Sequence, residues 1–342
     1  MDVPTVQPDD EVMPNATVLR FLVLALLWGS SFTLIKVSLE GLSPAQLVLA
    51  RLVLGAAVLL AVAGIRRIGL PKGRAVWGHL AGAAVFGNVL PFLLLSYGER
   101  TAGAGIAGVL IGATPLLTLT IAYVALAAER ASLRKVIGLV VGFGGLVLVV
   151  APWRDAGGSL GGELACFGAA VSYAISFVYV RRFLTPRGLA PLALAAGQLL
   201  VAVLLQAAVS PLLEWGPVHL TGRVVASILL LGALCTGLAY VLYFRLIADL
   251  GATTASAVNY VVPIAAVLIG AVLLGEPVTW NVVAGGLIVL AGMGYAENRL
   301  TLRRRTGTGT GDPGRPPHAP GAAGPGGHRD SAAPARRPAP GS

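Results

Sequence analysis

Residues 103–145 read GAGIAGVLIGATPLLTLTIAYVALAAERASLRKVIGLVVGFGG, and residues 251–292 read GATTASAVNYVVPIAAVLIGAVLLGEPVTWNVVAGGLIVLAG. Both segments carry a Gly-Ala pair, a proline, a glutamate and two glycines in the same order. The pattern residues are Gly103, Pro115, Glu129, Gly138 and Gly145 in the first segment and Gly251, Pro263, Glu276, Gly285 and Gly292 in the second. The spacings agree except for one residue between proline and glutamate, which predicts an internal repeat.

The repeat extends outward from these segments to earlier parts of each half. The matches, in chain order, are Trp28, Ser31 and Phe32 with Tyr173, Ser176 and Phe177; Pro44 and Arg51 with Pro191 and Gln198; and Gly82 and Gly87 with Gly232 and Gly237. Each half then holds five helices. Because five is odd, the second half begins on the opposite face of the membrane, and an inverted-topology repeat is predicted.

The chain is too apolar for a water-soluble domain. Of its 342 residues, 56% are hydrophobic and only 12% are charged, whereas soluble domains carry about 25% charged residues. Ten apolar runs approach the length that spans a bilayer, and in lipid such runs must be helical. We therefore expect an all-α polytopic membrane protein with ten transmembrane helices. The runs cover residues 18–38, 44–65, 76–97, 102–127, 134–151, 161–183, 190–212, 224–248, 251–274 and 279–297.

Loop charge predicts the orientation of these helices. With the N-terminus in the cytoplasm, the inner loops and the end of the last helix hold fifteen Lys and Arg residues, whereas the outer loops hold three, or four with Lys36 near the outer end of the first helix. Basic loops favour the cytoplasmic side. We expect a multi-pass protein of the bacterial inner (cell) membrane with both termini cytoplasmic. The formal net charge of +10 is explained in this way without nucleic acid as a partner.

Four parts of the chain are predicted. Residues 1–17 form a cytoplasmic N-terminal segment, residues 18–151 the first five-helix repeat, and residues 161–297 the second. Residues 306–342 are rich in Gly and Pro and contain no Ile, Leu, Val, Phe, Trp or Tyr. Such a composition cannot bury a core, so we expect a disordered cytoplasmic tail.

The motifs resemble those of a known family. They are the segment Trp28-Gly29-Ser30-Ser31-Phe32, Arg51, and the repeated proline–glutamate–glycine pattern, whose second copy contains Leu274-Gly275-Glu276-Pro277. Over residues 18–297 the chain resembles EamA-type transporters of the drug/metabolite transporter superfamily. The first copy departs locally, with Ala128 where the second has Gly275. The resemblance implies ten spans, a central pathway and export or exchange of metabolites, but no particular substrate.

Arg51 is the charged residue that lies deepest in an apolar run, about 10 Å along its helix at 1.5 Å per residue. A charge at this depth should face protein or water. Its guanidinium either meets a carboxylate or phosphate of the substrate, or it extends toward the outer surface or bonds to neighbouring carbonyls. Lys36 lies nearer the end of its run, where extension to the surface is the expectation.

Other pathway candidates are polar, aromatic or proline residues within the apolar runs. Pro115 and Pro263 interrupt helical hydrogen bonding, and the freed carbonyls face either a cavity or a packing kink. Buried amides either join helices or bind ligand. The remaining candidates are Trp28, Ser31, Asn88, Thr114, Tyr173, Gln198, Tyr240 and Asn259.

Structural roles are expected for other conspicuous residues. Glu129 and Glu276 each precede a helix start, where a carboxylate favours the dipole of that helix. The Gly108-x3-Gly112 and Gly138-x3-Gly142 motifs allow close helix packing, here expected within one chain. No Asp or Glu lies at the centre of a run, so no buried-carboxylate proton relay is expected.

These features predict a secondary transporter rather than an enzyme. We expect export of small amphipathic metabolites or amino-acid-like compounds by alternating access, without cofactor or metal. The lipid bilayer and a small-molecule substrate are the expected partners, and a homo-oligomer is left open. The alternatives are a carrier or flippase for nucleotide-linked or lipid-linked sugars, a channel, and a membrane-embedded enzyme, for which no catalytic constellation is visible.

Overall fold

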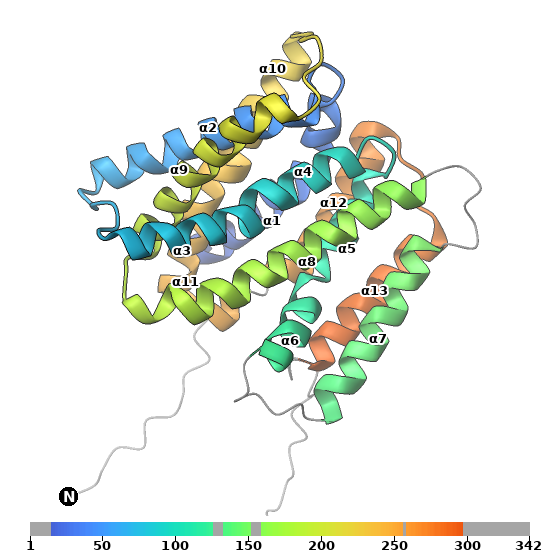
Figure 1. The fold of residues 1–342 in the computed structure, drawn as a ribbon. Helices are drawn as coiled ribbons and strands as arrows, with labels where there is room; N and C mark the ends of the chain where they lie inside the picture. The colour runs from blue at the N-terminus through green and yellow to red at the C-terminus, as the bar shows by residue number, and fades with distance from the viewer. Residues whose placement is uncertain (1–14, 126–132, 152–158, 256–257, 297–342) are drawn as a thin grey trace, which may run out of the picture. The chain divides into compact units, whose positions relative to one another are not determined.

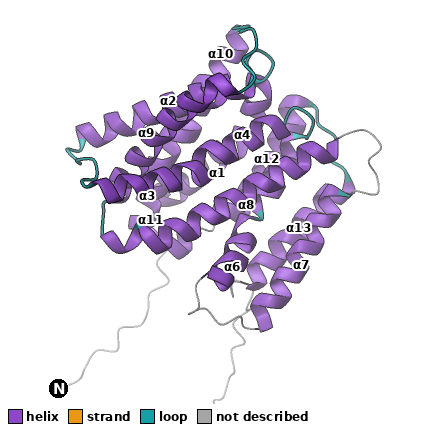
Figure 2. Cartoon of the chain, in the orientation of Figure 1, coloured by secondary structure: helices purple, strands orange, loops and turns teal. Residues whose placement is uncertain are grey.

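The computed structural model describes residues 15–125, 133–151, 159–255 and 258–296. The regular structure of these residues is helical throughout (Figure 2). The first half comprises α1 (Asn15–Ser38), α2 (Pro44–Ile65), α3 (Arg74–Ala84), η1 (Val85–Val89), α4 (Leu90–Gly98), α5 (Ala104–Gly112), α6 (Thr114–Ala125) and α7 (Leu133–Val150). The second half comprises α8 (Ser159–Phe183), η2 (Thr185–Arg187), α9 (Pro191–Val209), η3 (Ser210–Leu212), α10 (Gly222–Leu229), η4 (Leu230–Leu238), α11 (Ala239–Ala255), α12 (Val258–Leu274) and α13 (Trp280–Ala296).

Seven helices in the described part of the chain are long and apolar enough to cross a membrane. They include the composite helices Arg74–Gly98 and Gly222–Leu246, each of which continues through a π-helical segment. Val261–Leu274 and Trp280–Ala296 are shorter apolar helices. The all-helical class is therefore confirmed, with seven clear candidate spans rather than ten.

One predicted boundary is wrong. The sequence places a helix end near residue 248 and a new helix from residue 251, whereas α11 continues to Ala255 and α12 begins at Val258. Nothing at Gly251 forces a break, because glycine only weakens a helix, by about 1 kcal/mol relative to alanine. Glu129 and the tail 306–342 lie outside the described residues.

The α7 and α13 helices pack against each other through glycines (Figure 1). A Cβ added at Gly138 would lie 2.6 Å from the carbonyl oxygen of Gly292, and one added at Gly145 would lie 2.7 Å from that of Gly285. No side chain fits in these gaps. The four glycines of the repeated pattern thus meet one another across a single helix pair, which explains why they must be glycine.

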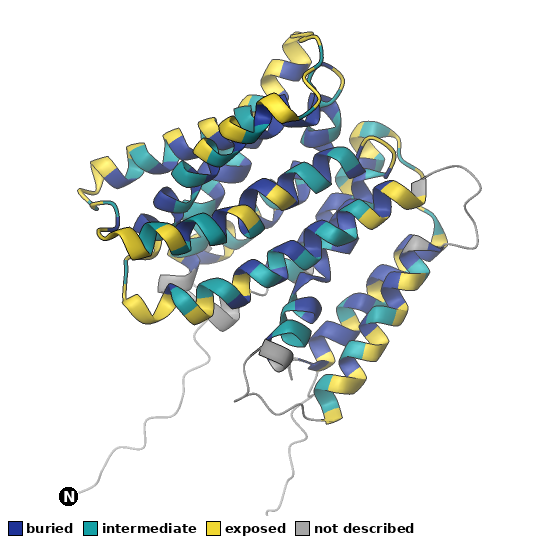
Figure 3. Ribbon diagram, in the orientation of Figure 1, coloured by how far each residue is buried: buried dark blue, intermediate teal, exposed yellow. Residues whose placement is uncertain are grey.

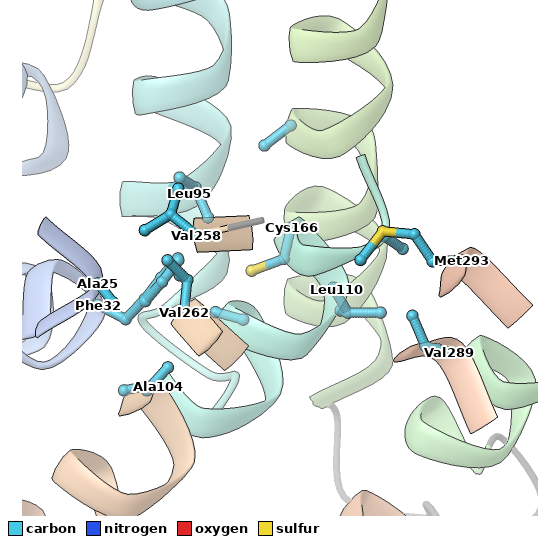
Figure 4. Close-up of a cluster of buried hydrophobic side chains, with 14 of the residues drawn as sticks. Ala25, Phe32, Leu95, Ala104, Leu110, Cys166, Val258, Val262, Val289 and Met293 are labelled. Atoms are coloured by element: carbon cyan, nitrogen blue, oxygen red, sulfur yellow. The ribbon is translucent and has the colours of Figure 1, made fainter. Parts of the chain in front are cut away.

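The α5 and α12 helices make a second close contact. Added Cβ atoms at Gly108 and Gly112 would overlap with Ala266 and Pro263 of α12. The predicted role of the Gly108-x3-Gly112 motif, close packing within one chain, is therefore confirmed. Around this contact lies the larger apolar core, in which Phe32, Leu110 and Val262 are buried (Figure 4).

Exposed residues recur along the helices (Figure 3), and many of them are large hydrophobic residues. Leu26, Val140, Phe177 and Leu268 are each more than half exposed, although they lie well inside long apolar helices. In water this surface would be unfavourable, whereas hydrocarbon is its natural solvent. The surface therefore agrees with a protein embedded in lipid.

The two repeat-related prolines affect their helices differently. Helical structure is interrupted at Ala113, between α5 and α6, and Pro115 occupies the second position of α6. Pro263 instead lies inside the continuous α12 helix. Both prolines are thus placed in helices as predicted, but only the first marks a break.

Candidate functional site

Arg51 of α2 is buried among helices, with 7% of its surface exposed. Its Nε donates a hydrogen bond of 2.9 Å to Thr236 Oγ1 in η4. Its guanidinium carbon lies 3.8 Å from the centre of the Phe92 ring of α4, a cation–π arrangement. The alternative in which the Arg51 side chain extends toward the outer surface is therefore wrong. The expectation that this charge faces protein is confirmed.

Aromatic groups and a thiol surround the guanidinium. Tyr173 of α8, Cys235 of η4, Tyr240 of α11 and the carboxyl group of Glu99, which directly follows α4, act on it electrostatically. Tyr173 also meets Phe92 edge to face, with ring centres 6.4 Å apart. Among the described residues no carboxylate forms an ion pair with Arg51, and only its Nε has a hydrogen-bond partner. The remaining N–H groups are suited to an anionic group.

A second polar contact lies nearby and uses the repeat-related residue. Gln198 of α9, the counterpart of Arg51, donates through Nε2 to Asn88 Oδ1 at 2.7 Å. Asn88 belongs to η1, and its buried Nδ2 has no hydrogen-bond partner among the described residues. Tyr240 lies beside Asn88 and also near Arg51. The two contacts therefore form one polar region between the halves.

The π-helical segments explain how these polar groups are presented. Such segments are uncommon and occur often at functional sites. In η4, Thr236 Oγ1 donates to the Leu231 carbonyl at 2.9 Å while accepting from Arg51. The side chain of Gln198 fills the space beside Gly87 of η1, where a Cβ would lie 2.8 Å from Nε2.

The other predicted pathway residues lie partly outside this region. The hydroxyls of Ser31 and Thr114 donate to carbonyls of the preceding turn, at 2.6 Å each, so both are satisfied within their own chain segment. Trp28 packs against Tyr243, with ring centres 5.3 Å apart. Asn259 is half-buried in α12. Arg51, Asn88, Tyr173, Gln198 and Tyr240 are thus the predicted residues that the structure brings together.

A charged cluster ties the halves together at another point. Glu276, between α12 and α13, accepts hydrogen bonds from the backbone N–H of Ala104 at 2.8 Å and of Gly105 at 3.1 Å. Lys36 Nζ donates to Glu276 at 3.2 Å and to the Ala102 carbonyl at 2.8 Å. Glu276 therefore caps α5 rather than the helix that follows it, and Lys36 is held by this cluster instead of extending to the surface.

Two buried carboxyl groups escaped the sequence analysis. Glu99, directly after α4, is 1% exposed, and Glu163 of α8 is 4% exposed. Neither lies at the centre of an apolar run, so the pattern of the sequence did not single them out. The expectation from the sequence concerned only a proton relay of carboxylates at the centre of a run, and the burial of these two carboxyl groups near helix ends is an additional finding. Thr236 and Phe92 were also missed, and only the nearby Gly232 and Gly237 hinted at the former.

Apolar helices that can cross a bilayer, with their polar side chains gathered between helices, define a multi-pass membrane protein. The EamA-like transporter family matches residues 15–151 and again residues 160–295. The chain therefore belongs to the EamA-like transporter family and carries two of its repeats.

Individual relatives agree with this assignment. A probable terminal-alkyne amino-acid exporter of Streptantibioticus cattleyicolor is 30% identical over 303 residues, covering 88% of this chain and 99% of the relative. The uncharacterized transporter YdfC of Bacillus subtilis is 27% identical over 278 residues, covering 78% and 86%. A solved crystal structure shares the fold, with a TM-score of 0.58 and 23% identity, and covers 85% of this chain and 99% of its own.

Proposed function

We propose that this membrane transporter exports a small amphipathic metabolite that carries an anionic group, such as an amino-acid-like compound. Transport proceeds by alternating access, in which the two halves move around a site that contains Arg51, Asn88 and Tyr240. The energy comes from an ion or substrate gradient.

The observation that carries this proposal is the unpaired guanidinium of Arg51. A buried charge is costly unless it is paired or hydrogen-bonded. In the described chain the cation has one neutral hydrogen-bond acceptor and an aromatic face, but no carboxylate partner. A substrate carboxylate would supply the missing charge and accept the fork of N–H groups.

Ten spans and an inverted repeat are part of the same proposal. One observation in support is that repeat-related glycines meet between α7 and α13. Another is that each half has a π-helical segment that contacts a polar residue of the other half. Loop charge further supports an inner-membrane protein with both termini in the cytoplasm. The boundaries 18–151 and 161–297 for the two repeats remain predictions, as does a dispensable tail over 306–342.

The substrate class draws support from one relative. The relative is named a probable terminal-alkyne amino-acid exporter, and the similarity covers almost its entire length. The rival proposal, a carrier of nucleotide-linked or lipid-linked sugars, needs several basic groups for the phosphates. Among the described residues, Arg51 alone of the Lys and Arg side chains is buried. One guanidinium suits one carboxylate better than a diphosphate.

Comparative metabolomics tests this function. We expect the medium of cells that overproduce the protein to be enriched in an anionic or zwitterionic small metabolite, and the medium of cells that lack it to be depleted. Cells that overproduce Arg51→Gln, at equal protein levels in the membrane, serve as the matched control. Enrichment of phosphorylated sugars, or no difference among the three strains, would contradict the proposal.

A further inference from the structure

Glu99 is a buried carboxyl group for which the transport site described above has no use. Both of its carboxyl oxygens are buried without a hydrogen-bond partner among the described residues. Its backbone N–H continues α4 by donating to the Leu95 carbonyl at 2.8 Å, so the side chain is held at a fixed place at the helix end. An ionised carboxylate in such a position would lack the donors that normally compensate burial.

The surroundings of Glu99 are charged on several sides. Lys36 of α1, Arg51 of α2 and Glu276 act on it electrostatically. From α8, Cys166 lies close to Glu99 and to Glu163; Cys166 faces the core beside Leu95 in Figure 4. Desolvation by burial raises the pKa of Glu99 well above its usual value of 4.5, Glu276 adds to this effect, and Lys36 and Arg51 oppose it.

Lys36 links this carboxyl group to the cluster that ties the halves together. Its ammonium group has three donors, of which one serves the Ala102 carbonyl and one serves Glu276. Ala102 follows Glu99 by only three residues. Glu276 in turn caps the first N–H groups of α5. A change of charge at Glu99 therefore acts directly on the cation that holds Glu276.

We propose that Glu99 is a proton-binding site that controls the contact of Lys36 and Glu276 with the start of α5. With the proton bound, Glu99 is neutral and Lys36 remains on Glu276, so the contact between the halves stays closed. When the carboxyl group gives its proton to water, it becomes a second anion that competes with Glu276 for the single ammonium group. The start of α5 then loses its cap, and this end of the molecule opens.

The direction in which pH changes closure follows from the direction of the pKa shift of Glu99. Because the closed state holds the proton more tightly than an open, hydrated state, low pH favours closure. As the pH rises from the usual carboxyl value of 4.5 toward the raised value in the closed state, closure weakens. One proton is released for each opening. On the basis of the proposed function, this proton is the coupling ion of the transport cycle.

Two measurements on the purified full-length protein test the site without any substrate. The first is the infrared carbonyl band of protonated carboxylic acids. We expect one protonated carboxyl group in the wild type at pH values above the usual carboxyl value of 4.5, and this group should be absent from Glu99→Gln. It should persist to higher pH in Lys36→Met, because Lys36 opposes the rise in pKa. The matched control is Glu214→Gln, an exposed carboxylate that pairs with Arg100.

The second measurement is hydrogen exchange at the N–H groups of Ala104 and Gly105, which Glu276 caps. After correction for the intrinsic pH dependence of exchange, wild-type protection should fall about tenfold per pH unit within the window given above, as linkage to one proton requires. Glu99→Gln mimics the protonated acid and should stay protected at every pH. Glu276→Gln should lose protection at every pH.

Identical pH profiles for wild type and Glu99→Gln would overturn the proposal, as would an infrared band that Glu99→Gln leaves unchanged. If Glu99→Gln does not fold, a pH-independent protection of Ala104 and Gly105 in the wild type overturns it equally. The metabolomic experiment decides the transported compound separately. Failure of the export proposal therefore leaves these two measurements valid, and their failure leaves the export proposal standing.

Discussion

Arg51 and Thr236 join the two halves through one hydrogen bond of 2.9 Å from Nε to Oγ1. The residues are 185 positions apart in the chain, and both are buried. Thr236 uses its own proton on the Leu231 carbonyl, so its oxygen is free to accept. The bond fixes the direction of the guanidinium and leaves its terminal nitrogens without a hydrogen-bond partner among the described residues.

Replacement of Arg51 is expected to weaken substrate binding. Loss of one charged hydrogen-bonded contact costs about 1.5–3 kcal/mol, so Arg51→Gln should reduce the apparent affinity roughly 10- to 150-fold. Arg51→Lys keeps the charge but not the fork of donors, and should retain part of the transport. The measurement is uptake by liposomes that contain the purified protein. Wild-type affinity in Arg51→Gln would refute the binding role.

The α7–α13 contact should not tolerate a side chain at Gly285. A Cβ there would lie 2.6 Å from Val149 Cγ2 and 2.7 Å from the Gly145 carbonyl oxygen. Gly285→Val should destabilise the protein by about 1–3 kcal/mol, the usual cost of overpacking. Gly286→Ala is the matched control, because its nearest neighbour would be Val109 at 3.7 Å. Equal thermal unfolding of the two variants in detergent would show that α7 and α13 are not packed in this way.

Removal of the Glu276 charge should destabilise the start of α5. Glu276→Gln loses the ion pair with Lys36 and weakens the bonds from two backbone N–H groups, an expected cost of about 1.5–3 kcal/mol. Glu214→Gln removes an exposed carboxylate paired with Arg100 and should change stability by less than about 1 kcal/mol. Thermal unfolding of both variants at neutral pH compares them. A milder effect in Glu276→Gln would mean that the α5 cap contributes little.

The orientation in the membrane can be tested at Lys72, an exposed residue of the loop between α2 and α3. With Cys166 and Cys235 replaced, Lys72→Cys should resist an impermeant thiol reagent in intact cells and react after permeabilisation. Lys72 is preferable to Gly73, whose φ of 100° disfavours other residues. Glu214→Cys, in the loop before α10, is the expected outward control. Labelling of Lys72→Cys in intact cells would reverse the assignment.

The membrane class, the helix-rich fold and the family were all accessible from the sequence. Hydropathy is a local property, so the run 44–65 predicts a helix whose bounds the structure reproduces as Pro44–Ile65. The repeated spacing of glycines likewise reports a local requirement for close approach, and Gly138 and Gly292 meet as their shared pattern suggests. The depth of Arg51 in its helix was sufficient to single it out as a residue that needs a partner.

The partners of the polar groups were decided only by the tertiary structure. Glu276 is followed closely by a helix, yet it caps α5, whose start lies 172 residues earlier. Glu99 looks like a loop residue, yet the packing of α1, α2 and α8 around it leaves 1% of its surface exposed. A sequence shows that a buried carboxylate or guanidinium must be neutralised or hydrogen-bonded. Which helix supplies the partner depends on contacts between residues far apart in the chain, and these exist only once the helices have packed.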